Sequence, residues 1–143
     1  MRKILGYSRG MRVTNAHFQN AFIDAWARLR AYSPKAGPVP GLEWSKRMTR
    51  TAGMACIEEG KVRLSVPLYH QYPEGFILEI VPHELAHVAA WRIFQDPGHG
   101  EGWKRCMHDA LGLQPHRLWT GARMLQHRRR WVEMQESKFL LEI

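Results

Sequence analysis

Apolar residues recur at helical spacing near the start of the chain. They follow Thr14 and Asn15, either of which could serve as an N-cap, and they mark one face of a helix to about Tyr32: Phe18, Phe22, Ala25, Trp26 and Leu29. The next stretch, SPKAGPVPG over residues 33–41, contains three prolines and two glycines. We expect a loop there, too short to link two domains.

Residues 42–67 show the pattern of short strands. The segments are LEWSKRM, TAGMACIE and KVRLSVP, and Glu59-Gly60 forms the turn between the last two. In the third segment apolar residues alternate with polar ones, which is the period of a half-buried strand: Val62, Leu64 and Val66. The pattern predicts a small antiparallel sheet.

A second helix is predicted from about Pro73 to Phe94, ended by the loop QDPGHG. Pro82 lies inside it, has no N–H, and would crowd the carbonyl of Leu78 at a cost of about 3 kcal/mol in a straight helix. We interpret Pro82 as a kink. The alternative is a helix that begins at Pro82, with FILEIV as a strand.

The rest of the chain is predicted to be mainly helical. A third helix runs from about Glu101 to Leu111, with Gly112 as its C-terminal cap, and the tail containing HRRRWVEMQE has a helical, basic pattern. The 143 residues are the size of one ordinary domain, and six tryptophans argue against disorder. The expected fold class is α+β, in one domain over residues 1–143.

The composition of the chain bears on the expected cellular location and on the chemistry of its cysteines. No stretch is long and apolar enough to span a membrane, and the start MRKILGYSRGMR lacks the apolar region of a signal peptide, so we expect a cytoplasmic protein. Cys56 and Cys106 form no CxxC pair, which excludes a thiolate zinc ribbon and favours buried, inert thiols.

The net charge of +8 is concentrated at the two ends of the chain. Residues 1–50 carry a net +8, residues 51–100 a net −3 and residues 101–143 a net +3. Such basic ends suit a polyanionic partner, and nucleic acid is the first candidate. A solvated basic surface without a partner explains the charge equally well.

The stretch VPHELAHVAAW carries the pattern H-E-x-x-H. On a helix, His83 and His87 point from one face and can bind zinc, while Glu84 can act on a water molecule as general base. A catalytic zinc needs a third protein ligand, and His99 lies in Gly-His-Gly just beyond the helix, where flanking glycines let the backbone turn back. His108 and His70 are the substitutes if His99 is not a ligand.

The motifs together resemble a known family. VPHELAHVAAWRIF and GHGEGWKRCMHDALGL, preceded by RTAGMACIEEGKVRLSVPLY, are similar to the SprT-like metalloprotease domain of bacterial SprT proteins and the eukaryotic Spartan protease. The resemblance covers about residues 15–113 and leaves a basic tail at 114–143. It implies a zincin-like single domain that binds one Zn²⁺ through His83, His87 and His99, with Glu84 as general base. It also implies that Trp103 packs behind the site and that a sheet edge holds an extended substrate chain.

The resemblance further implies protein substrates that are associated with DNA or crosslinked to it, and hence a role in DNA-protein crosslink repair. Bacterial relatives commonly continue into a cysteine-rich zinc ribbon, whereas no cysteine follows Cys106 here. DNA contacts are therefore expected from basic residues near the ends of the chain: Arg2, Lys3, Arg9, Arg12, Arg128, Arg129 and Arg130. Tyr7 and Trp131 could stack on unpaired bases, but buried packing is the favoured use of each.

Two other classes of protein share parts of this pattern. Peptide deformylases use H-E-x-x-H with an upstream cysteine ligand, but Cys56 in MACIEE matches their motif poorly. A non-enzymatic DNA-binding protein with a structural zinc is the stronger rival. It requires four protein ligands, and the sequence offers no obvious fourth.

Overall fold

The first long helix is α2 (Asn15–Tyr32), and a capping box sets its start. The computed structural model describes residues 11–141, and in it Thr14 is the N-cap. The Thr14 hydroxyl accepts a hydrogen bond from the backbone N–H of His17, and the His17 ring accepts one from the backbone of Thr14. The apolar face predicted for α2 is buried. The prediction of this helix is confirmed.

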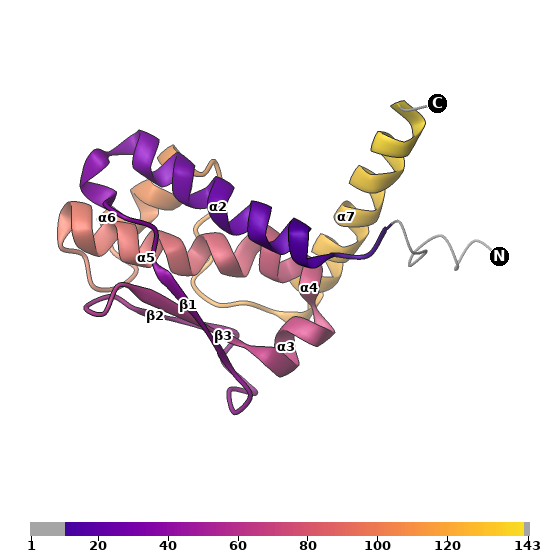
Figure 1. Cartoon of the computed structure of the whole chain (residues 1–143), viewed down its shortest axis with the longest axis horizontal. Helices are drawn as coiled ribbons and strands as arrows, with labels where there is room; N and C mark the ends of the chain where they lie inside the picture. Colours follow the sequence, from indigo (N-terminus) through magenta and orange to yellow (C-terminus); the bar gives the residue numbers. More distant parts are fainter. Residues whose placement is uncertain (1–10, 142–143) are drawn as a thin grey trace.

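Three short strands form a sheet on one side of the helices (Figure 1): β1 (Gly41–Ser45), β2 (Gly53–Cys56) and β3 (Lys61–Ser65). Their order is β1-β3-β2, with β2 antiparallel to β3 and β1 parallel to it. The prediction of a purely antiparallel sheet is therefore wrong. The chain reverses direction before and after β2, so β1 and β3 run the same way, and Glu43 of β1 pairs with Lys61 and Arg63 of β3.

β3 is shorter than the predicted segment because a helix begins early. β3 ends at Ser65, whose side chain accepts a hydrogen bond from the backbone N–H of Leu68 and caps α3 (Val66–Gln71). Pro67 lies in the first turn of α3, where its missing N–H has no cost. This helix was not predicted, although serine followed closely by proline is a helix-start signal.

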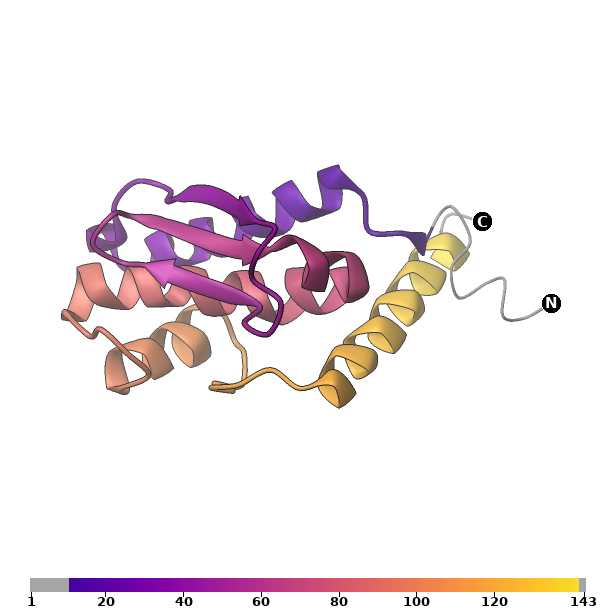
Figure 2. The same cartoon turned by 90° about the horizontal axis from the view of Figure 1, so that it is seen from below.

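A helical stretch runs through the middle of the molecule, as predicted for residues 73–94 (Figure 2). Its parts are α4 (Pro73–Gly75), the π-helical segment η3 (Phe76–Ile80) and α5 (Val81–Phe94). The π-helical turn comes just before Pro82, where a regular helix would bring the ring against the Leu78 carbonyl. The wider turn accommodates Pro82 within the helix, so the alternative of a strand over FILEIV is wrong.

The third predicted helix is present as α6 (Glu101–Arg105) and the π-helical segment η4 (Cys106–Ala110). Gly112, the predicted cap, has a φ of 67° and donates its N–H to His108. A glycine in this left-handed conformation ends a helix at little cost. Cys106 is buried and Cys56 is partly exposed, and both are free thiols.

The tail forms the predicted helix, α7 (Gly121–Leu141), and its first half belongs to the protein core. Met124 and Trp131 are buried in the same apolar cluster as side chains of α2 and α5. The Trp131 indole donates a hydrogen bond to the backbone oxygen of Met11 at 2.6 Å, which confirms packing as its use. Among the residues described, no helix combines the length and apolar character needed to cross a membrane.

Candidate metal centre

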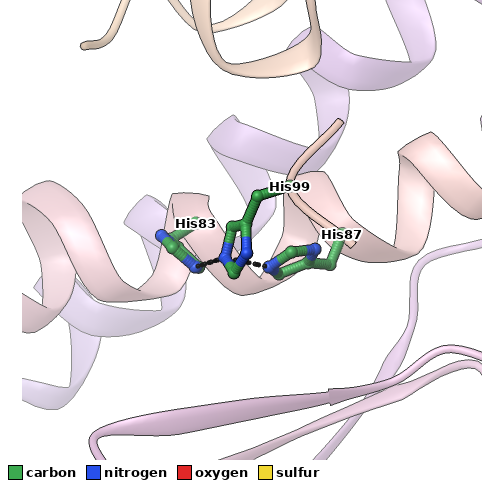
Figure 3. Close-up of side chains that lie close together, drawn as sticks. All are labelled: His83, His87 and His99. Carbon is green, nitrogen blue, oxygen red and sulfur yellow. Dashed lines mark hydrogen bonds between the residues drawn. The ribbon is translucent and has the colours of Figure 1, made fainter. Parts of the chain in front are cut away.

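Three histidines converge beside α5 (Figure 3). His83 and His87 extend from one face of α5, one turn apart, and His99 reaches them from the loop that follows the helix. The Nε2 atom of His99 lies 3.1 Å from that of His87 and 3.3 Å from that of His83. The three candidate ligand nitrogens lie within 4.8 Å of one another. The structure thus brings together the three histidines selected from the sequence.

Asp96 fixes the loop that carries His99. α5 ends with Gln95 in the left-handed conformation, at a φ of 58°. The Asp96 carboxylate then accepts hydrogen bonds from the backbone N–H groups of Gly98 and Trp103, each at 3.0 Å. These bonds hold the turn that directs His99 back toward α5. This role of Asp96 was not predicted.

The glycines on both sides of His99 were predicted to let the backbone turn back, but the structure does not use their conformational freedom. Neither Gly98 nor Gly100 has a positive φ. A Cβ atom on Gly100 would lie 2.9 Å from the Asp96 carboxylate, whereas one on Gly98 would meet nothing within 4 Å. Gly100 is therefore needed for the space that it leaves to Asp96, and not for a left-handed backbone.

The environment of the three imidazoles keeps them neutral. Burial lowers the pKa of His83 to about 4, and the charge of His99 adds to this effect. Burial, followed by the charges of His83 and His99, lowers the pKa of His87 to about 3. Burial also lowers the pKa of His99, with Arg117 as the second cause. Neutral imidazole is the form that binds metal ions.

Backbone groups also affect the pKa of two of the rings. The His83 ring forms a hydrogen bond to the backbone of His116, and the His87 ring forms one to that of Gly98. Each of these bonds raises the pKa of its ring, against the larger effect of burial. A ring nitrogen that donates to the backbone carries the proton, which leaves the opposite nitrogen with a free lone pair.

Trp103 forms the wall behind the histidines, as the family resemblance implied. Its side chain is fully buried, and its ring centroid lies 4.9 Å from that of His83, 5.4 Å from that of His87 and 4.6 Å from that of His99. The indole N–H donates to the backbone oxygen of His83 at 3.3 Å. One rigid side chain therefore limits the movement of all three imidazoles.

Glu84 lies beside the cluster and is not one of its members. Its Oε2 atom is 3.9 Å from Nε2 of His83, and only 7% of the residue is exposed. Burial raises the pKa of its carboxyl to about 8. A divalent cation held by the histidines would favour the charged carboxylate. Glu84 is thus placed to hold or release a proton next to a bound metal.

The cluster fits a tetrahedral metal ion. At zinc–nitrogen distances of about 2.0–2.1 Å, tetrahedral geometry places two ligand nitrogens about 3.3–3.4 Å apart. Two of the three separations, at 3.1 and 3.3 Å, come close to this spacing, and all three lie within 4.8 Å. Within residues 11–141 no cysteine or carboxylate joins the group, so three protein ligands would leave one position open.

The cluster opens into a cleft of about 370 Å³. Gly53 and Ala55 of β2 line it together with residues 50–52, and residues 117–119 also line it. The Trp119 indole donates a hydrogen bond at 3.2 Å to the backbone oxygen of Arg50, which joins these two segments. The contribution of residues 116–119 was missed, because the sequence-based division placed them in a tail outside the core. The signal that could have indicated their contribution is a single tryptophan, Trp119, in the polar stretch QPHRLWT.

A model of a known protein family matches most of the chain. The model of the SprT-like family matches residues 16–123. The chain belongs to the SprT-like family. This match also includes residues 114–119 and the start of α7, which the sequence-based boundary at residue 113 excluded.

Curated SprT-like relatives resemble the chain over part of its length. It is 39% identical over 95 residues to Protein SprT of Cronobacter sakazakii, covering 66% of this chain and 57% of that protein. It is 38% identical over 96 residues to Protein SprT of Escherichia fergusonii, covering 64% and 58%. The chain thus spans little more than half the length of these relatives. No solved structure shows a significant match.

The other candidate residues lie away from the cluster. His70 and His108 are exposed and do not join it, and His108 instead contacts Asp109. Arg128 forms an ion pair with the buried Glu74, while Arg129 and Arg130 are exposed. Of the N-terminal candidates, Arg12 is exposed, and the others lie outside the described residues: Arg2, Lys3, Tyr7 and Arg9.

Proposed function

We propose that this SprT-like protein is a zinc-dependent metallopeptidase with a zincin-like site. The observation that carries the proposal is the convergence of three neutral imidazole nitrogens beside a buried glutamate that is not part of the cluster. A structural zinc would need a fourth protein ligand, and the described chain supplies none at this site. Three ligands and a neighbouring carboxylate favour hydrolysis over a purely structural role.

In this mechanism His83, His87 and His99 would hold the zinc. Bound there, the metal supplies a Lewis acid and makes water acidic enough to be deprotonated near neutral pH. Glu84 accepts the proton of the attacking water and transfers it to the amine nitrogen that leaves. Trp103 and Asp96 keep the ligands in place by packing and hydrogen bonding.

The substrate would bind as an extended chain along β2. This strand pairs with β3 on one side only and is the edge of the sheet next to the cleft. Its free backbone groups can pair with a peptide, as in other cases of strand addition. Such pairing would place a peptide bond near the histidines, whatever the side chains of the substrate.

The protein substrates would be held on DNA or crosslinked to it. Support comes from the net charge of +8 and from exposed basic side chains at the two ends of the chain. Arg12 precedes α2, and its neighbour Met11 accepts the hydrogen bond of Trp131 in α7, one residue after Arg130. This contact brings the segment of Arg12 next to α7, so Arg12 and the exposed arginines of α7 could face the same phosphate backbone.

The test is proteolysis by wild type and by Glu84→Gln, with and without single-stranded DNA. The glutamine variant should keep its zinc, its stability and its DNA affinity, and should lose turnover by at least about a hundredfold, the scale of a general base. Undiminished cleavage by the variant would remove Glu84 from the mechanism. A zinc-loaded wild type that cleaves no protein under either condition would favour the non-enzymatic DNA-binding alternative.

A further inference from the structure

Two arginines from different parts of the chain line the cleft. Arg50 lies in the loop between β1 and β2, and Arg117 lies in the segment before α7. The hydrogen bond from Trp119 to the backbone of Arg50 holds these segments together. Both side chains are exposed, and within residues 11–141 neither forms a salt bridge or a side-chain hydrogen bond.

The acidic residues of the cleft leave this positive charge uncompensated. Glu79 also lines the cleft, but Arg123 and His127 of α7 contact its carboxylate at 2.7–2.9 Å. Glu84 is the remaining carboxylate among the lining residues, and its place is beside the histidines. A bound divalent metal would add further positive charge to the same cleft.

Arg117 lies within electrostatic reach of the cluster. The charge of Arg117 acts on the His99 ring strongly enough to lower its pKa, although less than burial does. The segment of Arg117 also meets the His83 ring through the backbone of His116. A ligand group bound by the pair would therefore lie beside the metal cluster, within the reach of a short peptide.

We propose that Arg50 and Arg117 form a subsite that selects an acidic side chain, Asp or Glu, in the peptide that occupies the cleft. The inference rests on the proposed function, because it takes the cleft to be a peptide-binding site. A guanidinium binds a carboxylate in a fixed, often two-pronged geometry, and a cleft wall strengthens such contacts relative to open solvent.

A peptide carboxylate suits this position better than a nucleic-acid phosphate. The pair lies inside the cleft with β2, whose free edge offers main-chain pairing to an extended peptide. The arginines outside the cleft, Arg12, Arg129 and Arg130, remain available for phosphates. Acidic selection at the site and phosphate binding at the ends of the chain can therefore operate together.

The test measures peptide binding to the zinc-loaded Glu84→Gln protein, so that no probe is consumed. The probes are fluorescein-labelled peptides without other charged residues, each with one Glu at a different position. Each peptide has a counterpart with Gln at the same position. We expect tighter binding of the Glu peptide by about fivefold or more at one or two adjacent positions. Adding Arg50→Gln or Arg117→Gln should remove this preference, and Arg117→Glu should reverse it toward Lys.

The matched control is Arg47→Gln, which removes an exposed arginine from the same loop but outside the cleft lining. It should leave the preference intact. Equal binding of the Glu and Gln peptides at every position, or no binding at all, overturns the subsite. The subsite is also overturned if single-stranded DNA, and not the acidic peptides, loses affinity in the two arginine variants. A preserved Glu preference without cleavage by wild type would instead contradict only the proposed peptidase activity.

Discussion

Gly53 lies directly against Glu84. A Cβ atom at residue 53 would be only 2.8 Å from Cγ of Glu84 and 3.1 Å from its Oε2 atom. The backbone of β2 can therefore approach the carboxylate because this residue has no side chain. The contact connects the edge strand of the sheet to the proposed general base.

Replacing Gly53 with alanine should displace Glu84 without removing a metal ligand. We expect turnover to fall by about 10- to 100-fold, because small errors in the placement of a general base are costly. Zinc content should be unchanged. Gly41→Ala is the control, since a Cβ there would meet Lys61 at an ordinary 3.5 Å within the same sheet. Normal turnover in Gly53→Ala would mean that the position of Glu84 does not limit the reaction.

Replacing Trp103 with phenylalanine should weaken zinc binding. The smaller ring leaves a gap beside the three imidazoles and removes the hydrogen bond to the His83 backbone. We expect the zinc dissociation constant to rise by about tenfold, measured by competition with a chelator. Trp91→Phe, at a partly exposed position of α5, the helix that carries His83 and His87, should have no such effect. Equal affinities in the two variants would limit Trp103 to general packing.

The ion pair of Glu79 with Arg123 should appear in the acid stability of the protein. Burial alone would raise the pKa of Glu79, but hydrogen bonds from Arg123 and His127 outweigh it and lower the pKa to about 2 from 4.5. Because the pKa of Glu79 is lower in the folded chain than in the unfolded chain, its ionised carboxylate stabilises the fold at pH values above about 4.5. This contribution disappears as the pH falls from about 4.5 to 2. Its size is on the order of 3 kcal/mol.

Urea unfolding of wild type and Glu79→Gln across this pH range measures the effect. The difference between their free energies of unfolding should be largest near neutral pH and should shrink toward pH 2. Asp24→Asn, which breaks an exposed pair with Arg28, should change stability by less than about 0.5 kcal/mol. A difference between wild type and Glu79→Gln that does not depend on pH would contradict the assigned pKa.

Local signals in the sequence were enough to predict several elements. The spacing of Phe18, Phe22 and Leu29 after Thr14 defines α2, because a helical period and a cap are both local properties. The pattern H-E-x-x-H likewise specifies that His83 and His87 share one face of a helix. Only the structure, however, shows that His99 meets them, since a loop residue has no periodicity.

Other features depend on contacts between distant segments. An alternating pattern shows which face of a strand is buried but not the direction of its partner, so the parallel pairing of β1 with β3 could not be inferred. Residues 116–119 have no regular pattern, yet Trp119 reaches the backbone of Arg50 across 69 positions. Asp96 was overlooked because its function lies in two backbone hydrogen bonds, which leave no signature in the sequence.

Zinc content is the most direct test of the central claim that three histidines form a metal site. Elemental analysis of purified wild type, His99→Ala and His108→Ala compares the loop histidine of the cluster with an exposed histidine outside it. The account predicts one zinc per chain in wild type and His108→Ala, and little or none in His99→Ala. A wild type without zinc, or a His99→Ala variant that retains it in full, would contradict the account.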